Sequence, residues 1–159
     1  MKCLFGLMLC LLPFWTAAEE LPLPRFASLK SNLINLRTGP GERFPIDWVY
    51  KRQDLPVEIT DEFEHWRKIK DFEGTTGWVH KKMLSGKRTV MTRPDQKIVL
   101  YKKEKENAAP TAYLNGLIIL TVIRCEALSP FCKVRLQDLT GYIKKNEVFG
   151  LYPNEEVDE

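Results

Sequence analysis

Apolar and polar residues alternate along several short stretches in the first half of the chain. At residues 46–51, which read IDWVYK, the large side chains of Ile46, Trp48 and Tyr50 stand at every second position. A period of two predicts a strand with one buried face. Glycine, proline and charged turn residues separate the stretches, and no stretch has a helical period. We therefore predict an all-β fold, with strands at residues 27–37, 46–51, 55–59, 66–71 and 77–80.

The same order of residues recurs about 64 residues further along the chain, which indicates an internal duplication. GWVH at 77–80 corresponds to GYIK at 141–144, WRKIK at 66–70 corresponds to FCKVR at 131–135, and Leu36 corresponds to Leu100. Repeat arrays usually have at least three units, so two copies favour two domains over a solenoid. We predict two tandem small barrels of about five strands each, at residues 27–86 and 88–150, with few shared core contacts.

Residues 35–41 read NLRTGPG, which is typical of a strand followed by a tight loop. Pro40 fixes its own φ near the value needed at the second position of a type II turn, and Gly41 is predicted to take the positive φ that follows. This loop, together with GWV at 77–79, resembles the bacterial SH3-like (SH3b) domain. The resemblance extends over residues 27–153 and implies two SH3-like barrels in an exported protein.

The second copy departs from the first in its loop. Where the first copy has GPG, residues 102–110 read KKEKENAAP and contain no glycine. We predict a longer, mobile and charged loop, and a degenerate second barrel. The ending VFGLYPNE at 148–155 resembles the segment that follows the last barrel in some exported proteins with paired SH3-like domains.

The first 18 residues have the order of a secretory signal peptide. Lys2 precedes an apolar run at residues 3–15, and small residues lead to a predicted cleavage site after Ala18. An apolar run of about 13 residues is too short to span a bilayer comfortably, which disfavours an uncleaved anchor. A lipoprotein would need a small residue before Cys10, where the chain has a leucine. We predict an exported protein, periplasmic or extracellular, with no membrane span after cleavage.

The charge of the chain is nearly balanced. Its formal net charge is +3, and removal of the signal peptide with Lys2 leaves about +2, which does not indicate a nucleic-acid partner. Prolines and a lack of periodicity at residues 19–26 predict an exposed lead-in. The acidic C-terminal tail at residues 151–159 is expected to be solvated and frayed.

Cys125 and Cys132 are the cysteines that remain after signal cleavage, and they flank a short turn. Residues that face each other across a hairpin have a Cα separation that a disulfide accepts, and export favours oxidation. A catalytic cysteine would need a histidine within hydrogen-bond reach, but His65 and His80 belong to the other predicted barrel. We therefore predict a structural disulfide between Cys125 and Cys132.

Cell-wall endopeptidases and amidases often carry SH3-like domains beside a catalytic domain. Two barrels leave only short segments of this sequence, too few residues for another core. His65 and His80 are a candidate metal pair, but two ligands without a third nearby make a poor site. We expect no catalytic activity, no bound metal and no cofactor.

A ligand site can be assigned from the resemblance. In SH3-like domains, aromatic side chains near the first long loop line a peptide groove. This implies a site formed by Phe44, Trp48 and Trp66, with Arg37 and Arg43 placed to bind a carboxylate. Alternatively, the three aromatic side chains belong to the core and Arg37 braces the loop, because a small barrel needs large side chains to bury enough surface.

Two functions from different classes are consistent with these features. The first is a non-enzymatic binding module of the bacterial envelope, which recognises peptidoglycan, its stem peptides or an extended protein segment. The second is a structural or regulatory accessory protein of a cell-wall hydrolase or another envelope complex, with no wall affinity of its own.

Overall fold

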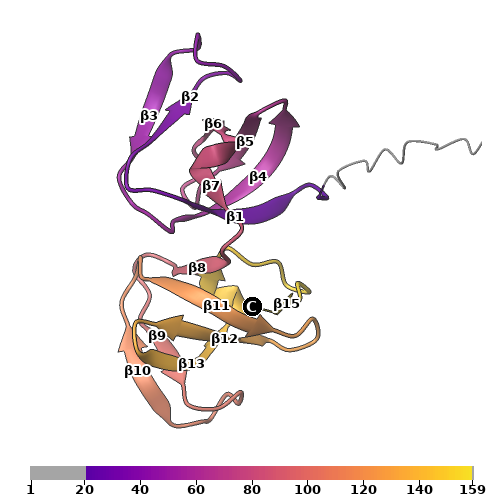
Figure 1. The fold of residues 1–159 in the computed structure, drawn as a ribbon. Coiled ribbons are helices and arrows are strands. Elements are labelled where there is room, and N and C mark those ends of the chain that lie inside the picture. The colour runs from indigo at the N-terminus through magenta and orange to yellow at the C-terminus, as the bar shows by residue number, and fades with distance from the viewer. Residues whose placement is uncertain (1–20, 159) are drawn as a thin grey trace, which may run out of the picture.

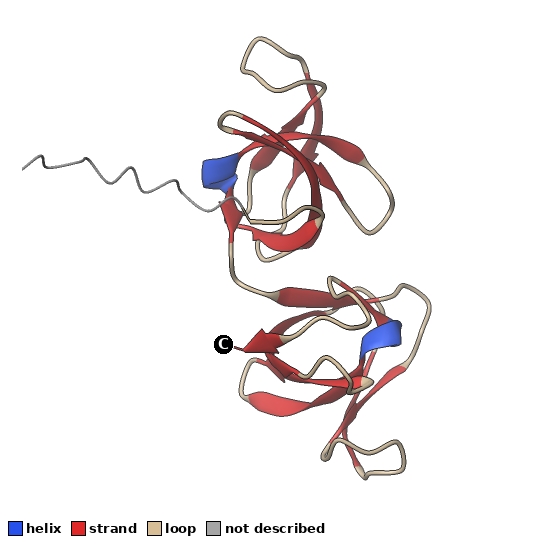
Figure 2. Cartoon of the chain, turned by 90° about the vertical axis from the view of Figure 1, so that its right-hand side faces the viewer, coloured by secondary structure: helices blue, strands red, loops and turns tan. Residues whose placement is uncertain are grey.

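The computed structural model describes residues 21–158 and contains two β-sheet units in tandem (Figure 1). The predicted signal peptide at residues 1–18 lies outside the described residues. The first barrel contains β1 (Arg25–Leu29), β2 (Ile34–Arg37), β3 (Ile46–Tyr50), β4 (Pro56–Phe63), β5 (Trp66–Lys70), β6 (Thr76–His80) and β7 (Leu84–Ser85). The second barrel contains β8 (Thr89–Thr92), β9 (Ile98–Tyr101), β10 (Pro110–Leu114), β11 (Ile119–Cys125), β12 (Phe131–Leu136), β13 (Leu139–Lys144), β14 (Val148–Phe149) and β15 (Val157–Asp158). Each unit also has one short 3-10 helix, η1 (Lys81–Met83) or η2 (Lys145–Glu147) (Figure 2).

The two antiparallel sheets have the same strand order. It is β3-β2-β6-β5-β4-β1-β7 in the first and β10-β9-β13-β12-β11-β8-β14 in the second, where β15 also pairs with β11. Corresponding strands begin about 64 residues apart, for example β1 at Arg25 and β8 at Thr89, or β2 at Ile34 and β9 at Ile98. The prediction of an all-β fold with two tandem small barrels is confirmed, although each sheet has more strands than the five predicted.

Each barrel encloses its own apolar core. The most deeply buried aliphatic side chains include Val57, Ile69 and Val79 in the first barrel and Leu120, Val134 and Ile143 in the second. Burying one such side chain stabilises the fold by roughly 1.5 to 3 kcal/mol before the entropy cost of ordering the chain is subtracted. The alternating apolar positions of both copies therefore account for the inner faces of the two sheets.

Gly77 and Gly141 occupy equivalent positions in the two barrels, where two strands come closest. A Cβ at Gly77 would lie 2.6 Å from Leu36 Cγ and 2.9 Å from the backbone oxygen of Arg37, and a Cβ at Gly141 would lie 2.6 Å from Leu100 Cγ. Leu36 and Leu100 are completely buried. The same contact between a glycine and a leucine thus closes both barrels.

The single strand predicted at residues 27–37 is two strands in the structure, because the chain turns at Ser31 and Asn32. The side-chain Oδ1 of Asn32 accepts a hydrogen bond from the backbone N–H of Gln53 at 2.9 Å. Short polar side chains of this kind offer the backbone an alternative to strand pairing. The predicted lead-in is also shorter than expected, since β1 begins at Arg25.

The loop after β2 does not contain the turn predicted at Gly41. Among the glycines of the described chain, a positive φ occurs at Gly74 and Gly150 and not at Gly41. Gly39 is the more constrained position, because a Cβ there would lie 2.4 Å from Cδ1 of the Phe44 ring, against 3.3 Å between a Cβ at Gly41 and Cδ2 of that ring. The loop closes through packing of Phe44 on Gly39.

The two barrels pack against each other through side chains near the connection between β7 and β8. Met91 of β8 joins the buried cluster of the first barrel, and Ile119 of β11 packs against the same cluster. The ring of Phe26 in β1 lies 5.3 Å from the ring of Phe149 and 4.7 Å from that of Tyr152. The two buried clusters have no residue in common, so this contact joins two separate cores, consistent with the expectation of few shared core contacts.

Hydrogen bonds reinforce this contact between the barrels. The Tyr152 hydroxyl donates to Glu58 Oε1 at 2.8 Å, and the Thr89 hydroxyl donates to the backbone oxygen of Asp54 at 2.8 Å. Both connect residues of the second barrel to the first. The interface thus satisfies polar groups as well as burying apolar ones.

The C-terminal tail is docked over residues 151–158, contrary to the expectation that it is frayed. Val157 pairs with Cys125 of β11 and is 8% exposed. The carboxylate of Glu155 forms an ion pair with Arg88 and accepts a hydrogen bond from the backbone N–H of Tyr152 at 3.1 Å. This segment thus supplies a buried apolar side chain, Val157, and a carboxylate, Glu155, that anchors an arginine.

The predicted disulfide is present. Cys125 and Cys132 face each other across the β11–β12 hairpin, with a Cα–Cα distance of 4.5 Å and a covalent bond between their sulfur atoms. The hairpin between these two residues is therefore closed by both the strand ladder and a covalent link.

Loss of this disulfide is expected to destabilise the protein. Closing so short a loop contributes about 2.5 kcal/mol in the chain-entropy model, so Cys132→Ser should lower the free energy of unfolding by about that amount. Chemical denaturation measures this change. Alkylation of the unreduced protein followed by mass spectrometry should leave both cysteines unlabelled, and two labelled thiols would contradict the assignment.

Candidate functional site

The outer side of the first sheet carries a row of side chains that crosses three strands. Arg37 of β2 pairs with Trp78 of β6, which pairs with Lys68 of β5. Directly paired residues point to the same side of a sheet. Leu36 and Val79, their neighbours in sequence, are buried in the core. The row of Arg37, Trp78 and Lys68 therefore faces away from the core.

A second row lies beside the first on the same side. Phe63 of β4 pairs with Trp66 of β5, and Trp66 pairs with His80 of β6. The rings of Trp66 and His80 meet edge to face with centroids 5.5 Å apart, and the His65 ring lies 6.0 Å from His80. We call the side chains of Phe63, Trp66, Trp78 and His80 the aromatic face of the first barrel.

The aromatic face has little charge of its own at neutral pH. Desolvation lowers the pKa of His80 below its ordinary value, and the nearby positive charges of Lys82 and Lys81 lower it further. The His80 Nδ1 accepts a hydrogen bond from the backbone N–H of Lys82 at 3.2 Å, which requires an unprotonated nitrogen. The positive charges of Arg37 and Lys68 thus border a neutral aromatic surface.

Three of the five residues assigned from the sequence meet in the loop between β2 and β3. Arg37 Nη1 donates to the backbone oxygens of Glu42 at 3.1 Å and Phe44 at 2.8 Å. The guanidinium of Arg43 lies 5.1 Å from the centre of the Phe44 ring. Arg37 therefore holds the loop in place through one of its nitrogens, next to the aromatic face.

The other two assigned residues lie on opposite sides of the sheet. Trp66 belongs to the aromatic face, whereas Trp48 of β3 pairs with Leu36 and so points to the other side of β2 and β3 from Arg37. Trp48 is 55% exposed, although its pairing partner Leu36 is buried. The structure does not bring Trp48 together with the remaining residues of the expected site.

Sequence reasoning left out Trp78, Phe63 and His80. The signal for Trp78 was present, since its neighbour Val79 belongs to the core and alternation then turns Trp78 outward. Phe63 and His80 depend on strand register, because each faces Trp66 from a different strand. The periodicity of one strand shows which side each residue faces, but not which residue of the next strand lies opposite it.

The second barrel has a corresponding outer face made of different residues. Tyr142 of β13 pairs with Tyr101 of β9 and with Lys133 of β12, and Phe131 pairs with Lys144. The rings of Tyr101 and Phe131 meet edge to face at 5.8 Å. Aromatic and basic side chains therefore occupy equivalent positions in both barrels.

The charged loop at residues 102–110 folds back onto the second barrel. Glu106 Oε1 lies 2.7 Å from Lys144 Nζ, and the hydrogen bond from Lys144 lowers the pKa of the Glu106 carboxyl. The Ser129 hydroxyl donates to the carboxylate of Glu104. The loop predicted to be mobile thus has two acidic side chains attached to the barrel.

The described part of the chain contains no cluster of three or more histidine, cysteine or acidic side chains suited to a metal ion. Within residues 21–158, no helix is long and apolar enough to cross a membrane.

Comparison with known proteins gives a match for the first barrel. Residues 30–86 match the family model of the bacterial SH3 domain, so the first barrel is similar to domains of that family. A search among curated proteins found no match. Similar solved structures include NlpC1 and NlpC2 from Trichomonas vaginalis, with 13% and 12% sequence identity and a TM-score of 0.36 in both cases. The alignments cover 87% and 82% of this chain but 50% and 49% of those proteins, so this chain spans about half their length.

Proposed function

We propose that this protein is an exported, non-enzymatic binding module of the bacterial envelope that recognises peptidoglycan, its stem peptides or an extended protein segment. The similarity of residues 30–86 to the bacterial SH3 domain supports this class of function. The proposal depends chiefly on one observation, the aromatic face of the first barrel, which lies on paired strands rather than on a flexible loop.

The chemistry of the aromatic face suits a ligand with flat apolar surfaces and carboxylates. Indole rings provide a large contact area at a small cost in side-chain entropy. Arg37 and Lys68 at the border of the face supply cations for carboxylates, such as those of stem peptides. Because strands fix the positions of these side chains, little ordering is needed on binding.

Removal of one indole ring from the aromatic face is expected to weaken binding strongly. We expect Trp66→Ala or Trp78→Ala to raise the dissociation constant for purified peptidoglycan by about 30-fold, the effect of losing roughly 2 kcal/mol at a central aromatic contact. Sedimentation of the protein with insoluble peptidoglycan measures the bound fraction. Thermal unfolding of each variant shows whether the barrel remains folded.

Trp48→Ala is a matched control, because Trp48 is an exposed tryptophan of the same barrel that lies off the aromatic face. It should bind peptidoglycan as the wild type does. Weaker binding by Trp48→Ala with normal binding by the other two variants would place the site on the opposite side of the sheet. Wild-type protein that does not sediment with peptidoglycan would favour the accessory role in an envelope complex.

A further inference from the structure

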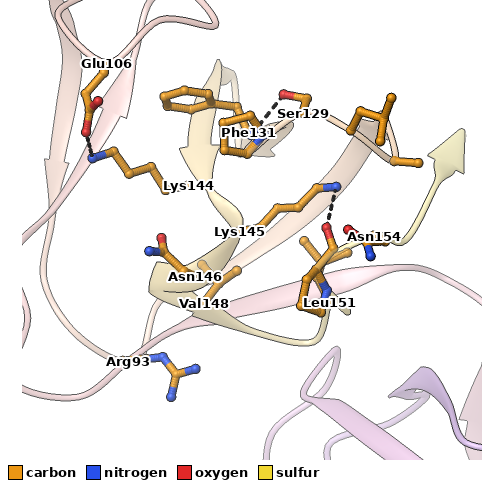
Figure 3. A pocket seen from close by; sticks show the side chains of 14 residues that line it. Arg93, Glu106, Ser129, Phe131, Lys144, Lys145, Asn146, Val148, Leu151 and Asn154 are labelled. Atoms are coloured by element: carbon orange, nitrogen blue, oxygen red, sulfur yellow. Dashed lines mark hydrogen bonds and ion pairs between the residues drawn. The ribbon is translucent and has the colours of Figure 1, made fainter.

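A groove of about 740 Å³ opens in the second barrel, away from the aromatic face of the first. It lies between the turn of the β11–β12 hairpin at residues 126–131, the short helix η2 and the C-terminal segment at residues 151–154 (Figure 3). This volume is within the range of roughly 300 to 1,000 Å³ found for small-molecule sites. We call it the second-barrel groove.

The walls of the second-barrel groove are held together by a buried lysine. Lys145 is 7% exposed, and its ammonium donates to the backbone oxygens of Glu126 at 2.7 Å, Pro153 at 3.1 Å and Glu155 at 3.3 Å. These bonds connect the hairpin turn to the C-terminal segment, and the disulfide closes the hairpin itself. An ammonium has three protons, so Lys145 fixes the groove and has no donor left for a ligand.

The surface of the groove combines apolar side chains with cations. Leu128 at the hairpin turn is 97% exposed and Leu151 is half-buried, whereas Phe131 and Val148, which also line the groove, are buried. The guanidinium of Arg93 also lines the groove and forms no ion pair with any residue in the range 21–158. An exposed apolar surface beside an unpaired cation is suited to an amphipathic anionic ligand.

The remaining accessible cation of the groove is already bound to a carboxylate from the chain itself. Lys144 contacts Glu106 of the loop at residues 102–110, and Figure 3 shows this pair at one edge of the groove, apart from Arg93. The Glu106 side chain is 73% exposed, so its ion pair is exchangeable and contributes little to stability. Glu106 therefore occupies Lys144 in the way that a ligand carboxylate would.

We propose that the second-barrel groove binds the carboxylate of a short extended peptide, which displaces Glu106 from Lys144 while its apolar side chains pack against Leu128 and Leu151. Arg93 supplies a second positive charge for the same ligand. This site is distinct from the aromatic face of the first barrel. Glu106 competes with the ligand for Lys144 and so lowers the apparent affinity of the groove for the ligand. Because the competing group is a carboxylate, a ligand of the same chemistry fits the position.

A pair of probes that differ only in the carboxylate tests this proposal on the purified protein. N-acetyl-trialanine with a free C-terminal carboxylate should bind about tenfold more tightly than its C-terminal amide, since a charge-assisted hydrogen bond to Lys144 is lost in the amide. Titration followed by NMR gives both dissociation constants. The amide signals that shift should be those of Lys144, Asn146 and Phe131.

Two substitutions should change the affinity in opposite directions. Lys144→Gln should abolish the preference for the free acid, whereas Glu106→Gln should raise affinity for the acid about threefold, because it removes the competitor and increases the fraction of protein able to bind. Glu104→Gln is the matched control for Glu106, since its carboxylate accepts a hydrogen bond from Ser129 instead of contacting Lys144. Lys102→Gln is the control for Lys144→Gln, because Lys102 is an exposed lysine of the loop at residues 102–110.

Equal affinity for acid and amide would overturn the proposal, as would a preference that survives in Lys144→Gln. Shifts confined to the first barrel would also overturn it. Trp66→Ala should leave this titration unchanged, so loss of peptidoglycan binding in that variant and loss of peptide binding in Lys144→Gln report on two separate sites.

Discussion

Gly77→Ala is expected to lower the free energy of unfolding by about 3 kcal/mol, at the upper end of the cost of overpacking a core. The added Cβ would lie 2.6 Å from Leu36 Cγ and 2.9 Å from the backbone oxygen of Arg37. The second contact is with the backbone of a paired strand, so a change of side-chain rotamer cannot relieve it. Chemical denaturation measures the loss.

Gly86→Ala is the matched control for this change. No atom lies within 4 Å of a Cβ built on Gly86, and its φ is not positive. Replacement of a glycine by alanine in such a position is neutral or slightly stabilising, because it reduces the freedom of the unfolded chain. Equal destabilisation by both substitutions would show that the close approach at Gly77 does not limit the fold.

Met91→Ala is expected to lower the stability of the protein and to weaken the coupling between the two barrels. Met91 lies on β8 of the second barrel, is 1% exposed and belongs to the buried cluster of the first barrel. Truncating a buried methionine to alanine costs roughly 2 to 5 kcal/mol. Because the cavity would open between the barrels, we expect thermal unfolding to separate into two transitions, followed by circular dichroism and calorimetry.

Val90→Ala provides the comparison, since Val90 is the neighbouring residue on β8 but belongs to the core of the second barrel alone. It should lower the stability of the second barrel and leave the coupling between the barrels unchanged. The contrary outcome is a wild type that already shows two transitions, of which Met91→Ala shifts only one. In that case the barrels would be independent despite their contact.

The alternation of side chains and the 64-residue repeat were sufficient to predict the fold class. Both signals can be read from the sequence alone. They persist in both copies because each strand must present one apolar face to a core. The match of Leu36 with Leu100 and of Gly77 with Gly141 corresponds to the same physical contact in the two barrels. The packing of one barrel on the other could not be predicted in this way, because it depends on contacts between single residues of different barrels, such as Phe26 and Tyr152.

The composition of the C-terminal segment was misleading. Several acidic residues close to a chain end are usually solvated, yet Glu155 forms an ion pair with Arg88, which lies 67 residues earlier. Val157 is the single apolar position in the last six residues, which is too little for a periodic signal. Its burial beside Cys125 follows from the space available along β11, which only the folded chain defines.

The candidate site could be predicted only in part, because it depends on strand register. Trp48 of β3 pairs with Leu36 of β2 and not with Arg37, the next residue along the strand. A shift of one residue moves every following side chain to the other side of the sheet. Trp48 therefore lies on the other side of β2 from Arg37, although the resemblance implied that both belong to one site.

The contact between the barrels also affects how the protein would bind a polymeric ligand. Phe26, Phe149 and Tyr152 hold the two units in one orientation, so the surfaces on either unit are separated by a constant distance. For two linked sites, the gain in avidity depends on whether both can be engaged at once. A repeating ligand can satisfy both only when the spacing of its units matches that distance. The rigidity of the pair would then select among polymers by their periodicity, even where the individual units are chemically identical.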